Sequence, residues 1–481
     1  MRRERPLAGA ARRVPGVADD AAPPLSPDLP PRRAALGAAE LLAPRDPRAG
    51  GDGSGLAARG AALSLVGPRD HGGRQPLVRY DAVVVGAGPS GAAAGILLAE
   101  RDLRVLVLDR ARFPRPKICG EYLSPEAARV LDRLGVLKRL EGGGAVRLSG
   151  MTITAPDGTR LTGSYPCAGR WRGYRDHALA VRRIVLDRVL ADRLRETAAD
   201  FLEGRRVTDV IVDGDGVVGV EVADGAGRPQ SIRARLVIAA DGRNSVVARR
   251  LGLVAPHALR RVALMTYASG ADGLADRGEI FVDPPVYAIV NPVAPGLVNL
   301  GLVLPLAGLS AHRGRLEELF DTRVRQLAGL RARFPRLARA APVHALGPLA
   351  YRVAPPRHGG VMLVGDAAGF YDPFTGEGIF AALRGAELAA DTACAALARS
   401  DCSARALAAY VRTRRAAFRD KERVTRVLQF VIARRWTANA AARVFARCPA
   451  LLSLVMGVFG DFVPPRALLG PPALAALLRR R

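Results

Sequence analysis

The chain has 481 residues, of which 49% are hydrophobic and 24% charged, so it is long enough for more than one domain of about 100 to 200 residues. These fractions lie near the globular average and exclude a fibrous, collagenous or wholly disordered protein. The formal net charge of +27 comes almost entirely from arginine, since Lys117, Lys138 and Lys421 are the only lysines. Because the arginine excess runs along the whole chain, it indicates a compositional bias, and we predict no nucleic-acid partner.

The cysteines and the terminal segments narrow the class of protein further. Five cysteines without a C-x-x-C pair or a Cys/His cluster argue against a disulfide scaffold, a zinc site or an iron–sulfur cluster. The N-terminus lacks the apolar core of a secretory signal, and no stretch reaches the ~18 to 20 apolar residues of a spanning helix. We therefore predict a cytoplasmic protein without a metal and leave attachment to the inner membrane surface open.

Residues 1–78 consist mainly of Ala, Arg, Pro and Gly and show no sustained helical or strand period. Such a segment cannot bury enough apolar surface to offset the entropy of ordering it. The sequence predicts either a disordered tail or a start codon placed too far upstream, so that the segment is not translated.

Order is predicted to begin at Tyr80 with one strand–helix–strand unit. An apolar strand over residues 82–85 is followed by a glycine turn, a helix of small residues over 90–100 and a second apolar strand over 105–108. Two strands without polar alternation, joined by a helix, indicate neighbouring strands of a buried parallel sheet.

The turn in this unit has the spacing G-x-G-x-x-G, formed by Gly86, Gly88 and Gly91. The first glycine permits the tight turn, the second lets a pyrophosphate approach the backbone, and the third lets the helix pack on the strand. The helix N-terminus attracts the anion. Asp109 closes the second strand, where a carboxylate would bind a ribose hydroxyl, and Arg110 directly follows it as a further predicted contact. The unit therefore predicts a dinucleotide site.

Downstream, the sequence mixes helical and strand segments. A helix is expected over residues 183–196, a hairpin over 207–222, and strands that end in glycines within 234–245 and 360–370. Residues 262–304 have strand character, with two apolar runs on either side of a Pro-Gly turn.

Three segments, VVVGAGPSG, IAADGRNS and LVGDAAGFYDPFTGEGI, together resemble FAD-binding oxidoreductases of the p-hydroxybenzoate hydroxylase fold over residues 80–400. Within that group, PRPKICGEYLSPEA at 114–127 is similar to a segment of the geranylgeranyl reductase family and related flavoprotein monooxygenases. The resemblance implies an α/β fold in which a Rossmann-type FAD-binding domain is interleaved with a β-rich substrate domain, followed by a helical C-terminal region.

The implied domains are discontinuous. The FAD-binding domain is expected over residues 79–150, 178–255 and 345–400, the substrate-binding sheet over 151–177 and 256–344, and the basic helical region over 401–481. The runs VALMTY, YAIV and LVNLGLVL in the substrate sheet are predicted to be apolar on both faces. A sheet that faces an apolar pocket and a sheet buried between helices would both show this pattern.

By the same resemblance, residues at the ends of three strands would hold the FAD. Asp366 would bind the ribitol, Asp241 and Gly242 would organise the region near the pyrophosphate, and either Arg183 or Arg182 would reach the cofactor. The helix after DPFTGEGI would aim its N-terminus at the flavin N1–C2=O group and stabilise the charge that develops on reduction. The remaining members of this predicted set are Gly365, Pro373, Gly376 and Gly378.

The resemblance places the loop with Lys117, Cys119, Glu121 and Tyr122 near the isoalloxazine ring. Lys117 would offset the charge of the reduced flavin, and Glu121 or Tyr122 would handle a proton. Cys119 is not expected to be a nucleophile, because no histidine lies nearby in the sequence to activate it. The open alternative is that Lys117 is a surface charge and Cys119 a small buried hydrophobe.

The predicted activity is that of a FAD-dependent oxidoreductase, with hydroxylation of a lipophilic aromatic or polyketide-like small molecule as the first choice. NAD(P)H would reduce the flavin while bound only transiently in a surface groove, since no second G-x-G-x-x-G unit is present. The alternative is reduction of isoprenoid C=C bonds, as in the geranylgeranyl reductase family. It ranks second because residues 287–292 read YAIVNP where those reductases commonly have an aromatic-rich strand ending in Phe-Pro. A flavin-binding protein without activity is the alternative from another class.

Residues 405–481 contain 16 Lys or Arg and three acidic residues, with apolar clusters between the charges. A basic helix with an apolar stripe can bind the interface of an anionic membrane, whereas a solvated helical cap on the domain has the same composition. The sequence leaves both alternatives open and does not specify the oligomeric state.

Overall fold

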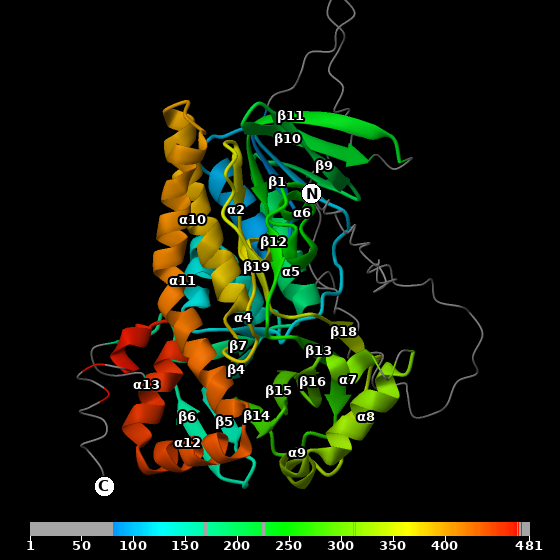
Figure 1. The fold of residues 1–481 in the computed structure, drawn as a ribbon, viewed down its shortest axis with the longest axis vertical. Coiled ribbons are helices and arrows are strands. Elements are labelled where there is room, and N and C mark those ends of the chain that lie inside the picture. Colours follow the sequence, from blue (N-terminus) through cyan, green and yellow to red (C-terminus); the bar gives the residue numbers. More distant parts are fainter. Residues whose placement is uncertain are drawn as a thin grey trace, which may run out of the picture. The chain divides into compact units, whose positions relative to one another are not determined.

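A computed structural model of the chain describes residues 80–166, 171–223, 227–310, 312, 314–468, 470 and 473 (Figure 1). The tail predicted over residues 1–78 lies outside the described residues.

Within the described residues, seven strands form a sheet around the first strand–helix–strand unit. Its order is β8-β2-β1-β11-β10-β9, and β20 also pairs with β11. The parallel strands are β1 (Tyr80–Val85), β2 (Val105–Asp109), β8 (Asp200–Glu203), β11 (Pro229–Ala239) and β20 (Val361–Leu363). The first half of β11 instead pairs antiparallel with β10 (Gly216–Ala223), which forms the predicted hairpin with β9 (Arg206–Asp213).

Helices cover one face of this sheet. α2 (Pro89–Ala99) is buried over its whole length and packs in one core with α5 (Arg183–Arg195) and α10 (Gly378–Ala398). Small residues permit the close packing, because a Cβ at Gly95 would lie 2.7 Å from Cγ2 of Val107. The other face packs against the β9–β10 hairpin and α6 (Val246–Arg250).

A second sheet has eight strands in the described part of the chain, in the order β17-β13-β16-β15-β14-β5-β6, with β18 paired to β13. The predicted Pro-Gly turn joins β15 (Val286–Ala294) to β16 (Leu297–Pro305). The other strands are β5 (Gly150–Thr154), β6 (Arg160–Ser164), β13 (Arg261–Ser269), β14 (Arg277–Asp283), β17 (Ala338–Arg339) and β18 (His344–Leu346). α7 (Ala307–Ser310), α8 (Leu316–Gln326) and α9 (Ala328–Arg333) accompany this sheet, and apolar residues of α8 and α9 close its core (Figure 1).

Short elements connect the two large sheets. β3 (Tyr122–Leu123), β7 (Ala178–Ala180) and β4 (Val146–Leu148) form one small sheet, and β12 (Val254–Pro256) pairs with β19 (Tyr351–Val353). The short helices are α3 (Ala127–Arg133), α4 (Leu137–Gly142), η1 (Gly242–Asn244), η2 (Gly365–Ala368) and η3 (Pro465–Leu468). β4 and β5 are neighbours in sequence but belong to different sheets. The division of the chain into an FAD-binding and a substrate-binding domain stays a prediction.

The described part of the C-terminal region contains three α-helices, α11 (Ala404–Ile432), α12 (Arg435–Arg447) and α13 (Pro449–Phe459), followed by η3. Ser403 caps α11 through a bond from the Ala406 amide, and Pro449 begins α13, where its missing N–H costs nothing. α12 and α13 lie beside β6 (Figure 1). No single helix in the described residues is long and apolar enough to span a membrane. Only α12 and α13 together reach that length and composition, and they are bent by 110°.

Candidate functional site

The first glycine motif forms the turn between β1 and α2. Gly86 has φ +95°, and a Cβ at Gly91 would lie 1.7 Å from the carbonyl oxygen of Gly86, so both positions require glycine. A Cβ at Gly88 would meet only Nη2 of Arg115, at 3.7 Å, within the described residues. The first turn of α2 contains no acidic residue, and no side chain of the described residues caps it. Its N–H groups and positive dipole end are therefore available to an anion.

Asp109 lies at the carboxyl end of β2, beside this turn. Its Oδ2 accepts a bond from the Ala87 amide and its Oδ1 accepts one from the Ala111 amide, each at 2.8 Å. Each carboxylate oxygen can accept a second bond, so Asp109 can still take a ribose hydroxyl. Arg110 follows it and is exposed.

Asp241 and Gly242 follow β11 and touch the first motif. A Cβ at Gly86 would lie 2.6 Å from the Ala240 carbonyl oxygen and 2.9 Å from Cα of Asp241. Oδ2 of Asp241 accepts a 2.7 Å bond from the Val246 amide, whereas its Oδ1 is buried without a hydrogen-bond partner among the described residues. Burial raises the pKa of the Asp241 carboxyl. A buried, unsatisfied acceptor at this point fits a cofactor with hydroxyl donors.

Gly365 and Asp366 follow β20, which pairs with β11. Gly365 has φ +57°, and a Cβ there would lie 2.7 Å from Oγ of Ser90 in α2. The third motif therefore contacts the first motif, and β11 places the second motif between them. Burial raises the pKa of the Asp366 carboxyl, and the charges of Arg183, Lys117 and Arg243 oppose that rise.

The loop after η2 leads into the 21-residue helix α10. Pro373 accepts a turn bond from the Gly376 amide at 3.0 Å, and a Cβ at Gly376 would lie 2.6 Å from the ring of Tyr122. α10 begins at Gly378 with no acidic residue in its first turn, and Glu377 at its N-cap makes no side-chain capping bond. That its dipole stabilises charge on the flavin stays a prediction.

The loop that precedes β3 buries Glu121 in a left-handed conformation. Glu121 has φ +56° and is 1% exposed. Its Oε1 accepts 2.7 Å bonds from the Arg183 amide and the Tyr267 hydroxyl, and its Oε2 accepts a 3.1 Å bond from Nδ2 of Asn299. Burial nevertheless raises the pKa of Glu121. Left-handed backbone at a buried acid is strain of the kind that functional sites retain.

The other predicted members of this loop have different surroundings. Lys117 is exposed, although its charge reaches Asp366. Cys119 has its pKa raised by burial, so it remains a neutral thiol. The hydroxyl of Tyr122 forms a short hydrogen bond with the hydroxyl of Tyr165 in a buried position. Glu121 therefore accepts hydrogen bonds from the first residue of α5 and from two strands of the eight-stranded sheet. The Tyr122 hydroxyl instead pairs with that of a second tyrosine.

The guanidinium of Arg183 is largely committed within its own helix. Its Nε and Nη2 donate to the two carboxylate oxygens of Asp187 at 2.9 Å each, and Arg115 approaches the same carboxylate at 3.1 Å. The positive charge of Arg183 also faces Cys119 and Asp366. Arg183 thus supports the site electrostatically, and its contact with the cofactor stays a prediction.

Three polar residues of the eight-stranded sheet were not among the predicted site residues. Tyr267, Asn299 and Asn291 lie opposite one another on β13, β16 and β15. Asn299 donates to the Cys119 carbonyl oxygen and Asn291 to that of Gly120, each at 2.9 Å. The prediction that VALMTY and LVNLGLVL are apolar on both faces is wrong at this row, because its polar side chains bind the loop. Asparagines inside apolar strands were the available signal, since buried amides need partners.

A second buried group lies behind the loop that precedes α10. Oδ1 of Asp372 accepts 2.7 Å bonds from the Tyr287 hydroxyl and Nε2 of Gln429, and a 2.9 Å bond from the Phe374 amide. These bonds connect the eight-stranded sheet, the loop and α11 at one carboxylate. They fix the position of the residues that precede α10.

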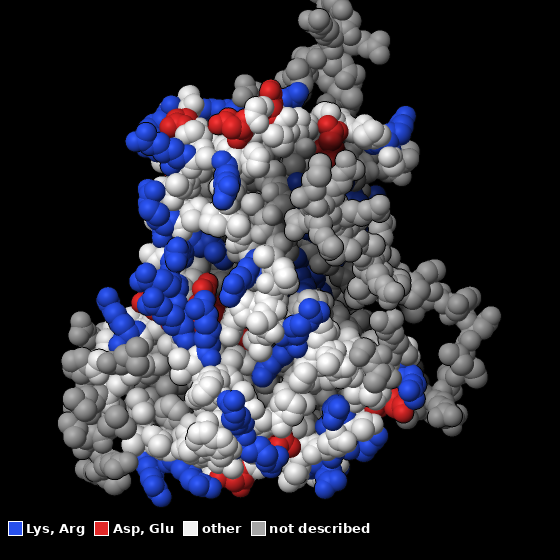
Figure 2. Space-filling view, viewed as in Figure 1, with Lys and Arg blue, Asp and Glu red and all other residues white. Residues whose placement is uncertain are grey.

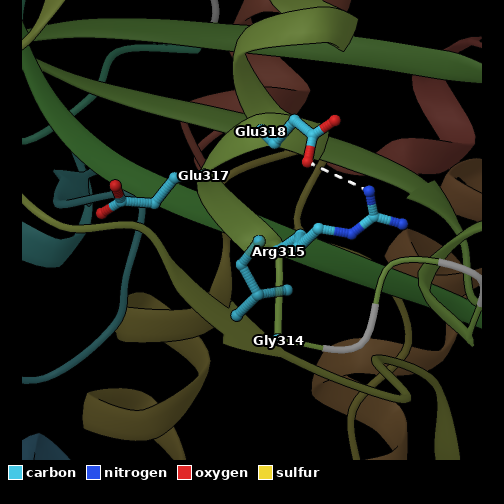
Figure 3. Close-up of a pocket in the computed structure, with 5 residues that line it drawn as sticks. Gly314, Arg315, Glu317 and Glu318 are labelled. Atoms are coloured by element: carbon cyan, nitrogen blue, oxygen red, sulfur yellow. Dashed lines mark hydrogen bonds and ion pairs between the residues drawn. The ribbon is translucent and has the colours of Figure 1, made fainter.

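A shallow pocket at the start of α8 is unrelated to these groups. Gly314, Arg315, Leu316, Glu317 and Glu318 line it (Figure 3). Arg315 and Glu318 form an ion pair at 3.4 Å with side chains 62% and 60% exposed, and such pairs contribute little in water. Glu317 points away from this pair (Figure 3). None of the predicted site residues lines this pocket.

The residues of the three motifs fit FAD. A glycine turn opens onto an uncapped helix, Asp109 lies at the end of the neighbouring strand, and the buried Oδ1 of Asp241 needs a donor. The uncapped helix suits an anion, Asp109 suits a ribose, and Asp241 suits a hydroxylated chain.

Comparisons with known proteins agree with this assignment. Residues 79–425 match a family described as FAD binding domain. Digeranylgeranylglycerophospholipid reductase 1 of Methanococcoides burtonii is 33% identical over 71% of this chain and 80% of its own length. Conditioned medium factor receptor 1 of Dictyostelium discoideum is 31% identical over 69% of this chain and 66% of its own length. A digeranylgeranylglycerophospholipid reductase of Methanosarcina mazei is 30% identical over 68% and 77%.

Solved structures share the fold. The flavin-dependent brominase Bmp2 superposes with a TM-score of 0.71 at 22% identity, over 82% of this chain and 97% of that one. A geranylgeranyl bacteriochlorophyll reductase-like protein of Thermoplasma acidophilum gives a TM-score of 0.62 at 22% identity, over 84% and 96%.

The fold and the sequence matches define a FAD-dependent enzyme, which sets aside a flavin-binding protein without activity. The chain belongs to the FAD-dependent oxidoreductases of the geranylgeranyl reductase and p-hydroxybenzoate hydroxylase-fold superfamily. The predicted mixed α/β fold with a helical C-terminal region is confirmed.

Proposed function

We propose that the protein is a flavin-dependent reductase of isoprenoid C=C bonds, with an unsaturated polyprenyl lipid as substrate. The observation that carries the proposal is the 33% identity with a digeranylgeranylglycerophospholipid reductase, which extends over 71% of this chain and 80% of that relative. This choice reverses the order of our two sequence-based alternatives, in which hydroxylation stood first.

Reduction of a C=C bond requires a hydride at one carbon and a proton at the other. When bound, FAD supplies the hydride chemistry. The chain must hold the proton, and Glu121 is suited to that task because burial raises the pKa of its carboxyl. The Tyr267 hydroxyl at 2.7 Å and Asn299 at 3.1 Å orient that carboxyl.

Hydroxylation remains the second candidate. The similarity to halogenases is below 25% identity and supports only the common fold. Residues 287–292 differ from the aromatic-rich strand that those reductases commonly have. This difference is now a weaker argument for hydroxylation, because Asn291 in that segment donates to the Gly120 carbonyl oxygen and so has a structural role. The electron donor, NAD(P)H in our prediction, is common to both reactions.

The test is a turnover measurement under anaerobic conditions. The purified holoprotein is reduced with dithionite and incubated with a digeranylgeranyl glycerophospholipid, and the lipid is analysed by mass spectrometry. We expect a gain of two hydrogen atoms for each double bond reduced. A parallel reaction with NADH or NADPH and air tests for oxygen insertion.

An unchanged lipid in the anaerobic reaction, together with an oxygenated product in air, would contradict the proposal and support hydroxylation. The variant Asp272→Ala, which alters an exposed ion pair with Arg336, serves as a control that should retain full turnover.

A further inference from the structure

The outward face of α11 and α12 combines arginines with exposed apolar side chains. On α11, residues that recur every three or four positions share one face, namely Arg419, Arg423, Arg426, Val427 and Phe430, and Arg434 follows just after the helix ends at Ile432. The next helix, α12, carries two further exposed apolar residues, Trp436 and Val444. We call these eight residues the basic–apolar face.

The apolar members of this face are exposed to an unusual degree for this molecule. Val427 and Phe430 are each 62% exposed, Trp436 70% and Val444 44%. In the described residues, the other large apolar side chains of this kind are Val212 at 46% and Val254 at 42%, on β9 and β12. Four of these six side chains therefore lie on the two consecutive helices α11 and α12, and such a concentration of exposed apolar surface is typical of an interaction site.

The inward face of α11 is occupied. Lys421, Thr425, Gln429 and Ile432 are buried, and Gln429 binds Asp372 at 2.7 Å. These contacts fix which face of α11 points into the protein. The apolar side chains on its outward face are not part of the core. Their exposure is a property of the folded protein and calls for a partner outside the described residues.

The charges on the basic–apolar face are held in weak surface pairs. Arg423 pairs with Asp420 at 3.2 Å and Arg426 with Glu422 at 3.5 Å, with both arginines about 60% exposed. Arg434 lies over the Phe430 ring at 5.4 Å. Figure 2 shows Lys and Arg side chains gathered along the surface where Figure 1 places α11. Exposed pairs of this kind can exchange their acidic partner for a phosphate at little cost.

We propose that the basic–apolar face docks on an anionic lipid surface. Phe430, Trp436, Val427 and Val444 enter the interface between headgroups and acyl chains, and the arginines bind lipid phosphates around them. The proposal rests on this surface and not on the substrate of the enzyme. If the substrate is a membrane lipid, however, the same helix connects the bilayer with the loop before α10, through Gln429 and Asp372.

A lipid surface fits this face better than the two other candidate partners. A nucleic acid would use the arginines and leave Val427, Phe430 and Val444 without an apolar environment. A second copy of the chain would place the arginine-rich helices of both copies against each other, which like charges disfavour.

The test uses sedimentation with vesicles of phosphatidylcholine, with and without an equal part of phosphatidylglycerol. We expect the full chain to sediment only with the anionic vesicles, and the bound fraction to fall as salt is raised, because salt screens the arginines. Phe430→Ser/Trp436→Ser should lower the affinity about tenfold or more, since each apolar side chain loses its transfer free energy. Arg423→Gln/Arg426→Gln should lower it about fivefold for each arginine removed.

The controls change exposed apolar and arginine residues elsewhere on the molecule. Val212→Ser/Val254→Ser removes two exposed apolar side chains that lie outside the basic–apolar face, and Arg336→Gln removes an arginine that is 77% exposed. Both should bind vesicles as the unaltered protein does. Every variant is first checked for flavin content and melting temperature, so that a folding defect is not taken for lost binding. In the Trp171→Phe background, Trp436 fluorescence should shift to shorter wavelength on binding.

Three outcomes would overturn the proposal. One is sedimentation that is absent, or that the Phe430→Ser/Trp436→Ser variant retains in full. Another is a dimer of the unaltered protein in lipid-free gel filtration that this variant loses. The third is binding to duplex DNA that the arginine variants lose and the apolar variants keep. Each of these results is independent of whether the enzyme reduces double bonds.

Discussion

Gly88 and Gly91 belong to one motif, but the structure gives them different reasons to be glycine. A Cβ at Gly91 would collide with the Gly86 carbonyl oxygen at 1.7 Å, whereas one at Gly88 would meet only an arginine nitrogen at 3.7 Å in the described residues. Gly91 is therefore required by the fold. Gly88 is required only if a ligand approaches its backbone.

Gly88→Ala should leave the free energy of unfolding within about 0.5 kcal/mol of the original value and weaken FAD binding about tenfold to a hundredfold. Gly91→Ala should destabilise the fold itself by about 1–3 kcal/mol or more. Urea unfolding of the apoprotein and FAD titration separate the two effects, with Gly142→Ala at an open position on α4 as the control. Unchanged FAD affinity in Gly88→Ala would mean that the pyrophosphate does not lie at this turn.

Asp366 is the residue for which the cofactor assignment is most easily tested. Its carboxyl lies in a buried environment near the charges of Arg183, Lys117 and Arg243. Asp366→Ala should purify largely without FAD, because it would lose a hydrogen bond to the ribitol, while Asp272→Ala on an exposed pair should purify yellow. Full flavin absorbance in Asp366→Ala would show that our assignment of the third motif is wrong.

Tyr267 acts through Glu121, so we treat it as a positioning residue. Its hydroxyl donates a bond that lowers the pKa of Glu121, opposing the larger effect of burial. A proton donor is active below its pKa, so activity falls as the pH rises through that value. Tyr267→Phe removes the bond and raises the pKa of Glu121 further, and the falling limb of the pH profile for kcat should move to higher pH. A lowered kcat with an unmoved limb would leave Glu121 without a role in proton transfer.

At the scale of elements, α11 has two faces with separate tasks. The outward face carries the proposed lipid contacts, while the inward face places Lys421 between the carboxylates of Asp461 and Glu377. Burial works against the charge of Lys421, but these two acids raise its pKa above the usual value. Burial also raises the pKa of both acids, and Lys421 opposes that rise. This cluster fastens α11 to the residue that precedes α10.

Lys421→Met should destabilise the protein by about 3–5 kcal/mol at neutral pH, because it leaves two buried carboxylates without a cation. In the variant both carboxyl pKa values rise further above their unfolded values. The stability they contribute is therefore present at acidic pH and lost as the pH rises through the folded values. Urea unfolding across pH should show the deficit shrinking toward acidic pH, with the exposed Lys138→Met as the control. A deficit that does not vary with pH would contradict this account.

The elements differ in how far the sequence predicts them. The unit from β1 to β2 is predicted closely, because its strands, turn and helix are contiguous and each has a local signal. The row of Tyr267, Asn299 and Asn291 could not be predicted, because it depends on the register of three strands. Its partners Cys119 and Glu121 lie more than 140 residues away in sequence. An isolated asparagine in an apolar strand indicates a buried partner but does not identify it.

At the scale of the molecule, the account depends on segments that are far apart in the chain. The glycine turn after β1, the residues after β11 and those after β20 contact one another at the carboxyl ends of adjacent parallel strands. Ligands of open parallel sheets bind at this edge. The sequence predicts the three motifs by resemblance, whereas their convergence follows only from the strand order β1-β11-β20.

The most direct test of this convergence is amide hydrogen exchange of the apoprotein before and after reconstitution with FAD. We predict that FAD slows exchange at residues 86–91, 241–246 and 365–378 together, while the exposed helix face at Arg423–Val427 is unaffected. Protection confined to one of the three segments, or no protection at all, would contradict the claim that they bind a single FAD.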